Sequence, residues 1–125
     1  MPRNAIQPEG VARPKPPYSP VVVSGDHVFT AGQVAFDAEG KLVGTTIEDQ
    51  TRLTLENLRA CLEAAGSSLD EVVKVTAFLA DLDDFPGYNA VYTEFFSEPY
   101  PARSSVGATL PPGVLVEIEA VARRL

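Results

Sequence analysis

The segment from Pro101 to Ala122 places the strongest constraint on the fold of this chain. Between residues 116 and 120 apolar and acidic side chains alternate strictly. Successive side chains of a strand point to opposite faces, so Glu117 and Glu119 share one face and the apolar residues share the other. The pattern predicts a strand that buries one face and exposes two carboxylates on the opposite one.

A second strand is predicted upstream, beginning just after Pro101 and carrying Arg103. Pro111-Pro112-Gly113 separates the two strands and is typical of a tight turn, because proline presets φ and glycine tolerates a positive φ. If the two strands pair, Arg103 can approach the acidic face of its partner. From spacing alone, we therefore expect a cross-strand ion pair between Arg103 and Glu119 on an exposed face.

Two other segments have the period of amphipathic helices. Leucines and alanines recur three and four residues apart between about 46 and 65, after a capping-box pattern formed by Thr45 and Glu48. A second helix is predicted near Pro86, which suits an early helical position, and it ends before Pro99. Its core-facing stripe consists of Tyr88, Val91, Tyr92, Phe95 and Phe96, with Asn89 beside it.

The remaining strands complete an alternating order of elements. Residues 21–23 and 28–30 predict a hairpin around a Ser-Gly-Asp turn. Residues 72–80 predict a strand with Val73, Val75, Ala77 and Leu79 on one face, whereas the prolines of residues 1–17 predict an extended arm. The order β-β-α-β-α-β-β predicts an α+β fold in which one mixed sheet carries both helices on a single face, within one domain spanning residues 1–125.

Composition excludes several classes of function. A formal charge of −7, from 10 basic and 17 acidic residues, disfavours nucleic-acid binding, which depends on clustered Lys and Arg. The single Cys61 and the single His27 predict no disulfide, no zinc cluster and no metal site. We expect no membrane association and a cytoplasmic location, because no secretory signal and no run of about 20 apolar residues is present.

Short motifs spread along the chain resemble those of a known family. They are Pro17-Tyr18-Ser19, Thr30-Ala31-Gly32-Gln33, Glu56-Asn57-Leu58, Ala64-Ala65-Gly66, Val73-Lys74-Val75-Thr76, Asp84-Phe85 with Tyr88-Asn89-Ala90, Pro101-Ala102-Arg103, Leu110-Pro111 and Val116-Glu117-Ile118-Glu119-Ala120. In this order they resemble the RidA/YjgF family of imine deaminases, from about Tyr18 to the end of the chain. The resemblance implies a RidA/chorismate-mutase-like fold and a homotrimer with ligand clefts between subunits.

The resemblance also implies a reaction and a set of site residues. The reaction is hydrolysis of reactive enamines and imines, such as 2-aminoacrylate, to 2-keto acids and ammonia, with no cofactor. Arg103 would clamp the substrate carboxylate, a role that suits its planar fork of N–H donors. Glu117 would position or activate water, while Tyr18, Gly32 and Asn89 would line the cleft. Ser105 lies where several members of the family carry cysteine.

Two other functions remain open at this point. The chain can be a non-catalytic trimer of the same fold that binds metabolites such as 2-keto acids, and turnover of imines would separate this from the deaminase. It can also be a ribonuclease or translation inhibitor, which the acidic charge and the single histidine make the weaker hypothesis.

Overall fold

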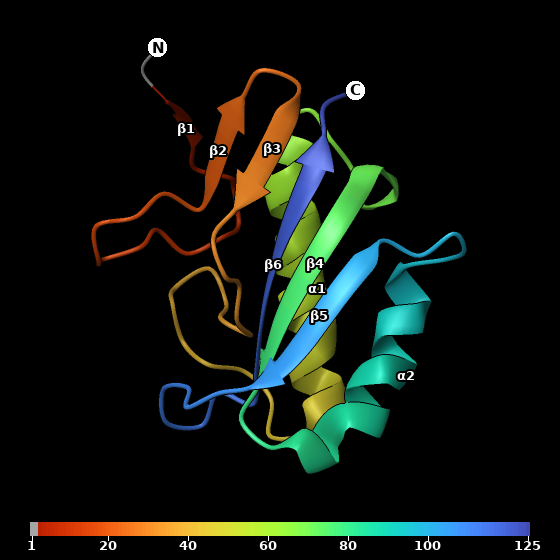
Figure 1. Ribbon diagram of the computed structural model, residues 1–125. Coiled ribbons are helices and arrows are strands. Elements are labelled where there is room, and N and C mark those ends of the chain that lie inside the picture. The colour runs from red at the N-terminus through yellow and green to blue at the C-terminus, as the bar shows by residue number, and fades with distance from the viewer. Residues whose placement is uncertain (1–2) are drawn as a thin grey trace.

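The computed structural model describes residues 3–125, which form a six-stranded sheet with two helices on one face (Figure 1). The sheet order is β1-β2-β3-β6-β4-β5, and every neighbouring pair is antiparallel except β4 and β5. The strands are β1 (Asn4–Ile6), β2 (Val21–Ser24), β3 (His27–Thr30), β4 (Val72–Leu79), β5 (Ala102–Gly107) and β6 (Val116–Arg123). The helices are α1 (Ile47–Ala64) and α2 (Phe85–Phe95), with short 3₁₀ turns at Leu69–Glu71 and Leu82–Asp84. The predicted mixed α+β sheet is confirmed.

The predicted pairing of the last two strands is wrong. β5 and β6 lie on either side of β4, with β5 parallel to it and β6 antiparallel (Figure 1). The connection through α2 returns the chain to the edge of the sheet in the parallel direction, as a β-helix-β crossover does. β6 then inserts between β3 and β4, where it has two hydrogen-bonding partners instead of one. The turn at Pro111–Gly113 does form, with a hydrogen bond from the Val114 amide to the Pro111 carbonyl and a positive φ at Gly113, but it joins strands that do not pair.

Local details differ at three other places. The arm predicted over residues 1–17 contains the short strand β1, which adds to the edge of the hairpin; the first two residues of the arm lie outside the described part. Thr46, one residue after the predicted cap, caps α1 by accepting a hydrogen bond from the Asp49 amide. A shift of register at the start of β4 turns Val73 away from the face that it was predicted to share with Val75. Val72 takes the buried position on that face instead.

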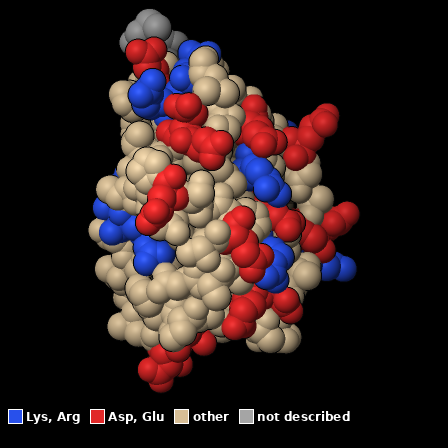
Figure 2. Space-filling model, turned by 90° about the vertical axis from the view of Figure 1, so that its right-hand side faces the viewer, with Lys and Arg blue, Asp and Glu red and all other residues tan. Residues whose placement is uncertain are grey.

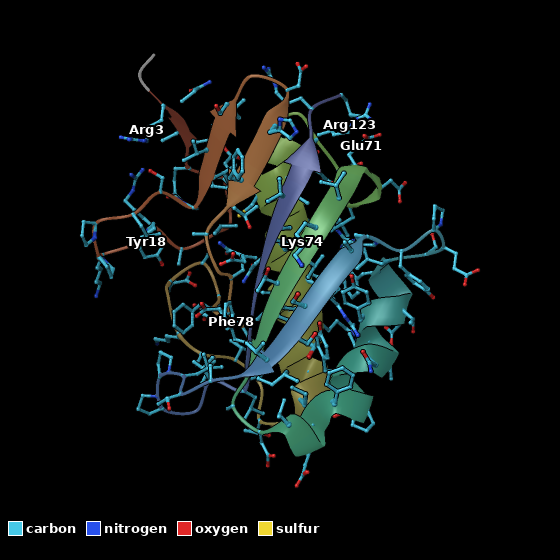
Figure 3. All side chains as sticks on the ribbon, in the orientation of Figure 1. Arg3, Tyr18, Glu71, Lys74, Phe78 and Arg123 are labelled. Carbon is cyan, nitrogen blue, oxygen red and sulfur yellow. The ribbon has the colours of Figure 1, made fainter. Side chains whose placement is uncertain are left out.

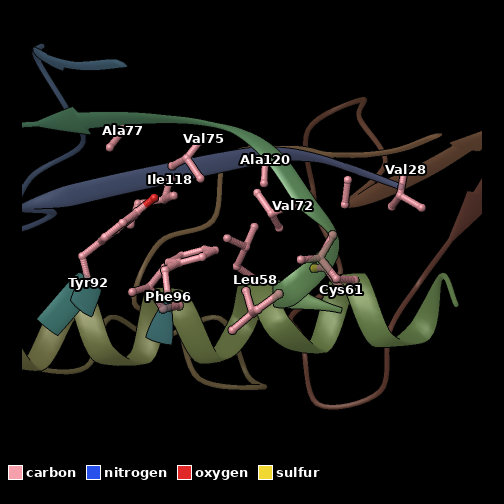
Figure 4. Close-up of a cluster of buried hydrophobic side chains, with 14 of the residues drawn as sticks. Val28, Leu58, Cys61, Val72, Val75, Ala77, Tyr92, Phe96, Ile118 and Ala120 are labelled. Carbon is pink, nitrogen blue, oxygen red and sulfur yellow. The ribbon is translucent and has the colours of Figure 1, made fainter. Parts of the chain in front are cut away.

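The core lies between the sheet and the helices (Figure 4). Leu58 and Cys61 of α1 and Tyr92 of α2 contact the face of the sheet that carries Val75 and Ile118. Each such apolar side chain contributes about 1.5–3 kcal/mol when it is fully removed from water. Cys61 is fully buried, and burial raises the pKa of its thiol to about 12, which disfavours the reactive thiolate near neutral pH.

The opposite face of the sheet carries no helix (Figure 3). Lys74 and Phe78 project from it, and Val106 and Phe29, each 44% exposed, lie on it as well. Acidic side chains are scattered over the side of the molecule that carries α2, with basic ones interspersed and no continuous basic patch in that view (Figure 2). Neither helix of the described residues combines the length and the apolar character that a bilayer crossing requires.

Candidate functional site

Arg103 lies on the same face of the sheet as the helices. Its register partner in β4 is Val75, whose side chain is fully buried beneath α2. The Arg103 Cζ atom lies 4.6 Å from the ring centroid of Tyr92, 5.1 Å from that of Tyr88 and 5.6 Å from that of Phe85. A guanidinium within about 6 Å of an aromatic face is attracted by its quadrupole. Within residues 3–125 Arg103 forms no ion pair. The guanidinium therefore contacts aromatic rings, and no carboxylate of the described residues accepts hydrogen bonds from its N–H groups.

A pocket opens beside this guanidinium. It is lined by Asn89, Tyr92, Thr93, Tyr100, Pro101 and Arg103. Asn89 and Arg103 therefore come together as the resemblance implied, one from α2 and one from β5. An amide and a free guanidinium are donors for a carboxylate or a carbonyl oxygen.

Glu117 belongs to a different pocket, together with Tyr18 and Gly32. The segment that contains Gly32 is tied to β6 by two backbone hydrogen bonds between Gln33 and Ile118, at 2.8 and 3.0 Å. The Glu117 side chain crosses directly over Gly32. A Cβ atom at Gly32 would lie 2.8 Å from Glu117 Cδ and 2.9 Å from Cγ, and would contact Oε2 more closely still. Glycine at this position leaves room for the carboxylate to pass over the backbone, and a larger residue would displace the Glu117 side chain.

Two buried amides support the walls of the Glu117 pocket, and the sequence analysis did not assign them a role. Asn57 donates to the carbonyls of Val34 and Phe36 at 3.0 and 2.9 Å. Gln50 donates to the Gly113 carbonyl at 2.9 Å and accepts from the Leu115 amide at 2.8 Å. Both lie on the buried face of α1. The sequence could have indicated them, because each is a polar residue within the apolar stripe of the predicted helix.

The candidate residues therefore form two groups that do not meet within one chain. Arg103 and Asn89 lie on the helix side of the sheet. Glu117 and Glu119 both lie on the open side of the sheet. Glu117 is in register with Phe78 of β4, and Glu119 is in register with Thr76. The predicted ion pair between Arg103 and Glu119 is wrong, because alternation along β5 and β6 directs the two side chains to opposite faces. Glu117 and Arg103 accordingly line different pockets.

Comparison with known proteins identifies the family. A family model described as endoribonuclease L-PSP matches residues 10–124. A RutC family protein of Pyrococcus horikoshii is 47% identical over 122 residues, which cover 96% of this chain and 97% of that protein. The chain belongs to the RidA/YjgF family.

Other members of the RidA/YjgF family carry more specific names. A 2-iminobutanoate/2-iminopropanoate deaminase of Dermatophagoides farinae is 38% identical over 122 residues, covering 96% of this chain and 95% of that protein. The crystal structure of Escherichia coli TdcF with bound serine superposes with a TM-score of 0.90 and 39% identity, covering 98% of this chain and 99% of that one. The fold predicted from the family resemblance is thus confirmed.

In this RidA/YjgF chain the protonation of Glu117 is set by its surroundings. Half-burial is the larger cause that raises the pKa of its carboxyl, and the neighbouring charge of Glu119 raises it further. A carboxyl group with a raised pKa can accept and return a proton more readily near neutral pH than an exposed one. This property suits an acid/base group and is not expected of a solvated surface glutamate.

Replacing Gly32 with alanine is expected to displace the Glu117 carboxylate. The added methyl group occupies space that the flexible Glu117 side chain now fills, so this side chain must move aside, at a small loss of unfolding free energy. Chemical denaturation measures the loss, and the carbon-13 shift of the Glu117 carboxyl carbon against pH reports the altered pKa. Gly107→Ala is the matched control, because a Cβ there meets Leu82 at 3.4 Å or more. An unchanged Glu117 titration in Gly32→Ala would contradict the packing described.

Proposed function

We propose that this protein hydrolyses the enamines and imines of small 2-amino acids, such as 2-aminoacrylate, to 2-keto acids and ammonia. The observation that carries the proposal is Arg103, whose guanidinium lines a pocket and forms no ion pair with any described residue. Such a fork can bind a substrate carboxylate through two parallel hydrogen bonds and fix the imine carbon for attack. The name of the Dermatophagoides farinae relative supports the same class of substrate.

The chemistry assigns the second role to Glu117. An enamine first takes a proton at carbon to become the imine. Water then adds to the C=N carbon of the protonated imine and loses a proton, and the nitrogen gains one. The C–N bond breaks to release ammonia while the remaining hydroxyl group gives its proton to the released ammonia or to solvent, which leaves the ketone. Glu117 would accept the proton from the attacking water and return it to nitrogen, which its raised pKa favours. Under this proposal the hydrolysis requires only binding of the carboxylate and transfer of protons.

The proposal requires that two half-sites meet, and we infer that they do so between subunits of a homotrimer. Arg103 and Asn89 lie near the edge strand β5, and Tyr18, Gly32 and Glu117 form a pocket elsewhere on the chain. The open face of the sheet, with exposed apolar side chains such as Val106, offers a surface that a second copy can cover. The trimer implied by the family resemblance accounts for both features.

A coupled assay tests the reaction. An amino-acid oxidase generates imines in the cuvette, semicarbazide traps those that persist, and active protein lowers the amount trapped in proportion to its concentration. Several amino acids, beginning with alanine and 2-aminobutyrate, define the preference. Binding of 2-oxobutanoate without any turnover would instead favour the metabolite-binding trimer. Cleavage of RNA in a salt-dependent manner would favour the activity that the family model's description names.

Mixing two inactive variants is expected to restore activity if the site is shared. In a cyclic trimer refolded from equal amounts of Arg103→Ala and Glu117→Gln, about a quarter of the interfaces combine a normal Arg103 half with a normal Glu117 half. The mixture should thus recover about a quarter of wild-type turnover, and sedimentation equilibrium should give three times the monomer mass. Refolding each variant alone is the control. No recovery in a confirmed mixed trimer, or a monomeric wild type, would contradict the shared site.

A further inference from the structure

The side chains beneath Arg103 form a connected cluster that the proposed reaction does not use directly. Tyr88 is its centre, with its ring centroid 5.8 Å from that of Phe85 and 5.9 Å from that of Tyr92. The Tyr88 side chain is fully buried and does not line the Arg103 pocket. It therefore acts on that pocket through the lining residues it contacts, which are Arg103 and Tyr92.

The hydroxyl group of Tyr88 is tied to the strand that carries the arginine. Its oxygen lies 3.2 Å from Ser105 Oγ, at hydrogen-bonding distance. Ser105 and Arg103 are two residues apart on β5 and therefore share a face. Tyr88 is thus held by its neighbouring rings at one end and by β5 at the other, which fixes the ring plane beneath the guanidinium.

The electrostatic setting keeps this hydroxyl group neutral. Burial raises the pKa of Tyr88, and the hydrogen bond to Ser105 opposes that rise, as do the charge of Arg103 and its hydrogen bonding to the phenol oxygen. A neutral phenol can donate to Ser105 and still present its ring face to the cation. No described carboxylate competes with the rings for Arg103.

We propose that Tyr88, locked by Ser105, is a positioning residue that holds the Arg103 guanidinium in its carboxylate-binding orientation before substrate arrives. The effect of Tyr88 on catalysis rests on the proposed function, whereas its effect on the orientation of Arg103 does not. The rings attract the cation and leave most of its five N–H donors available, whereas a bidentate ion pair would occupy two of them. The Tyr88–Ser105 pair thus supplies orientation and leaves the guanidinium fork available for the ligand.

The test uses Tyr88→Phe, which keeps the ring and removes the hydroxyl group, and Ser105→Ala, which removes the partner. In the free protein, we expect ring currents of the three aromatic side chains near Arg103 to shift its Nε–Hε resonance. We expect both variants to move that resonance, and the double variant to move it no further. We also expect kcat/KM to fall about three- to tenfold, chiefly through KM, with the same lack of additivity.

The matched control is Ser67→Ala, which deletes another buried hydroxyl hydrogen bond, to the Arg123 carbonyl, away from the site. It should lower stability without moving the Arg103 resonance or KM. The proposal is overturned if Tyr88→Phe leaves the Arg103 resonance unchanged, or if the two single effects simply add. If the wild-type protein shows no turnover, the deaminase function is rejected but the positioning role is not. The change of the Arg103 Nε–Hε resonance in the free variants still tests that role.

Discussion

Replacing Arg103 with lysine is expected to reduce kcat/KM almost as far as replacing it with alanine, by about 10²–10³-fold. Lysine keeps the positive charge but loses the planar fork, and its compact ammonium group cannot make two parallel hydrogen bonds to one carboxylate. It also rests less favourably on the rings of Tyr88 and Tyr92, which now hold the guanidinium. The coupled deaminase assay measures the loss for both variants.

Arg52→Lys is the matched control for this change. Arg52 pairs with Glu94 on the surface, at 3.1 Å, and its replacement should leave kcat/KM near the wild-type value. Near-wild-type activity in Arg103→Lys would show that charge alone attracts substrate and would refute the clamp. An unfolded Arg103→Ala variant would instead indicate that the arginine chiefly joins β5 to α2.

Glu117→Gln is expected to reduce kcat/KM by about 10²–10⁴-fold, the usual contribution of one acid/base group. In the wild type, the acid limb of the kcat/KM profile should lie above the ordinary range of a glutamate, because burial and Glu119 raise the pKa of Glu117. Glu119→Gln removes the second cause and should move that limb to lower pH while turnover persists. A profile that is the same in Glu119→Gln would contradict the assignment of Glu117 as the titrating group.

The same raised pKa predicts a gain of stability in Glu117→Gln. The folded state binds the Glu117 proton more tightly than the unfolded state does, so stability falls as pH rises from the ordinary glutamate pKa through the raised folded value. At pH 7 the charged carboxylate is therefore a net cost, which a neutral amide of similar shape avoids. Thermal melts at pH 7 should show a higher Tm for Glu117→Gln, and the difference should shrink as the pH is lowered.

Elements governed by local sequence could be predicted, whereas pairings between distant segments could not. The 21–30 hairpin and both helices follow from turn residues and from apolar periodicity, and they formed where expected. The position of β6 between β3 and β4 depends on hydrogen bonds to segments far away in the chain, and nothing in its own alternation specifies which neighbours it takes. Val73 was misplaced for a related reason, because a bulge shifts the period of two by one residue.

The site shows the same division. Arg103, Glu117, Tyr18, Gly32 and Asn89 were identified by family resemblance, since alternation and spacing favoured a surface ion pair. The structure separates them into two groups and gives Gly32 its physical reason, which is the carboxylate that crosses it. The supporting cluster around Tyr88 was expected only as a core stripe, because a helical period cannot show which strand residue lies above it.

The central place of β6 in the sheet has a consequence for how the chain is made. Among the described strands, β6 is synthesised last, yet it is the strand that joins β1–β3 to β4–β5 in the sheet. Until it leaves the ribosome, these two parts of the sheet cannot share hydrogen bonds, and the apolar faces of β4 and α1 stay partly uncovered. Nascent chains arrested before residue 116 should consequently be cut quickly by protease, and those extended beyond the exit tunnel should become resistant in a single step.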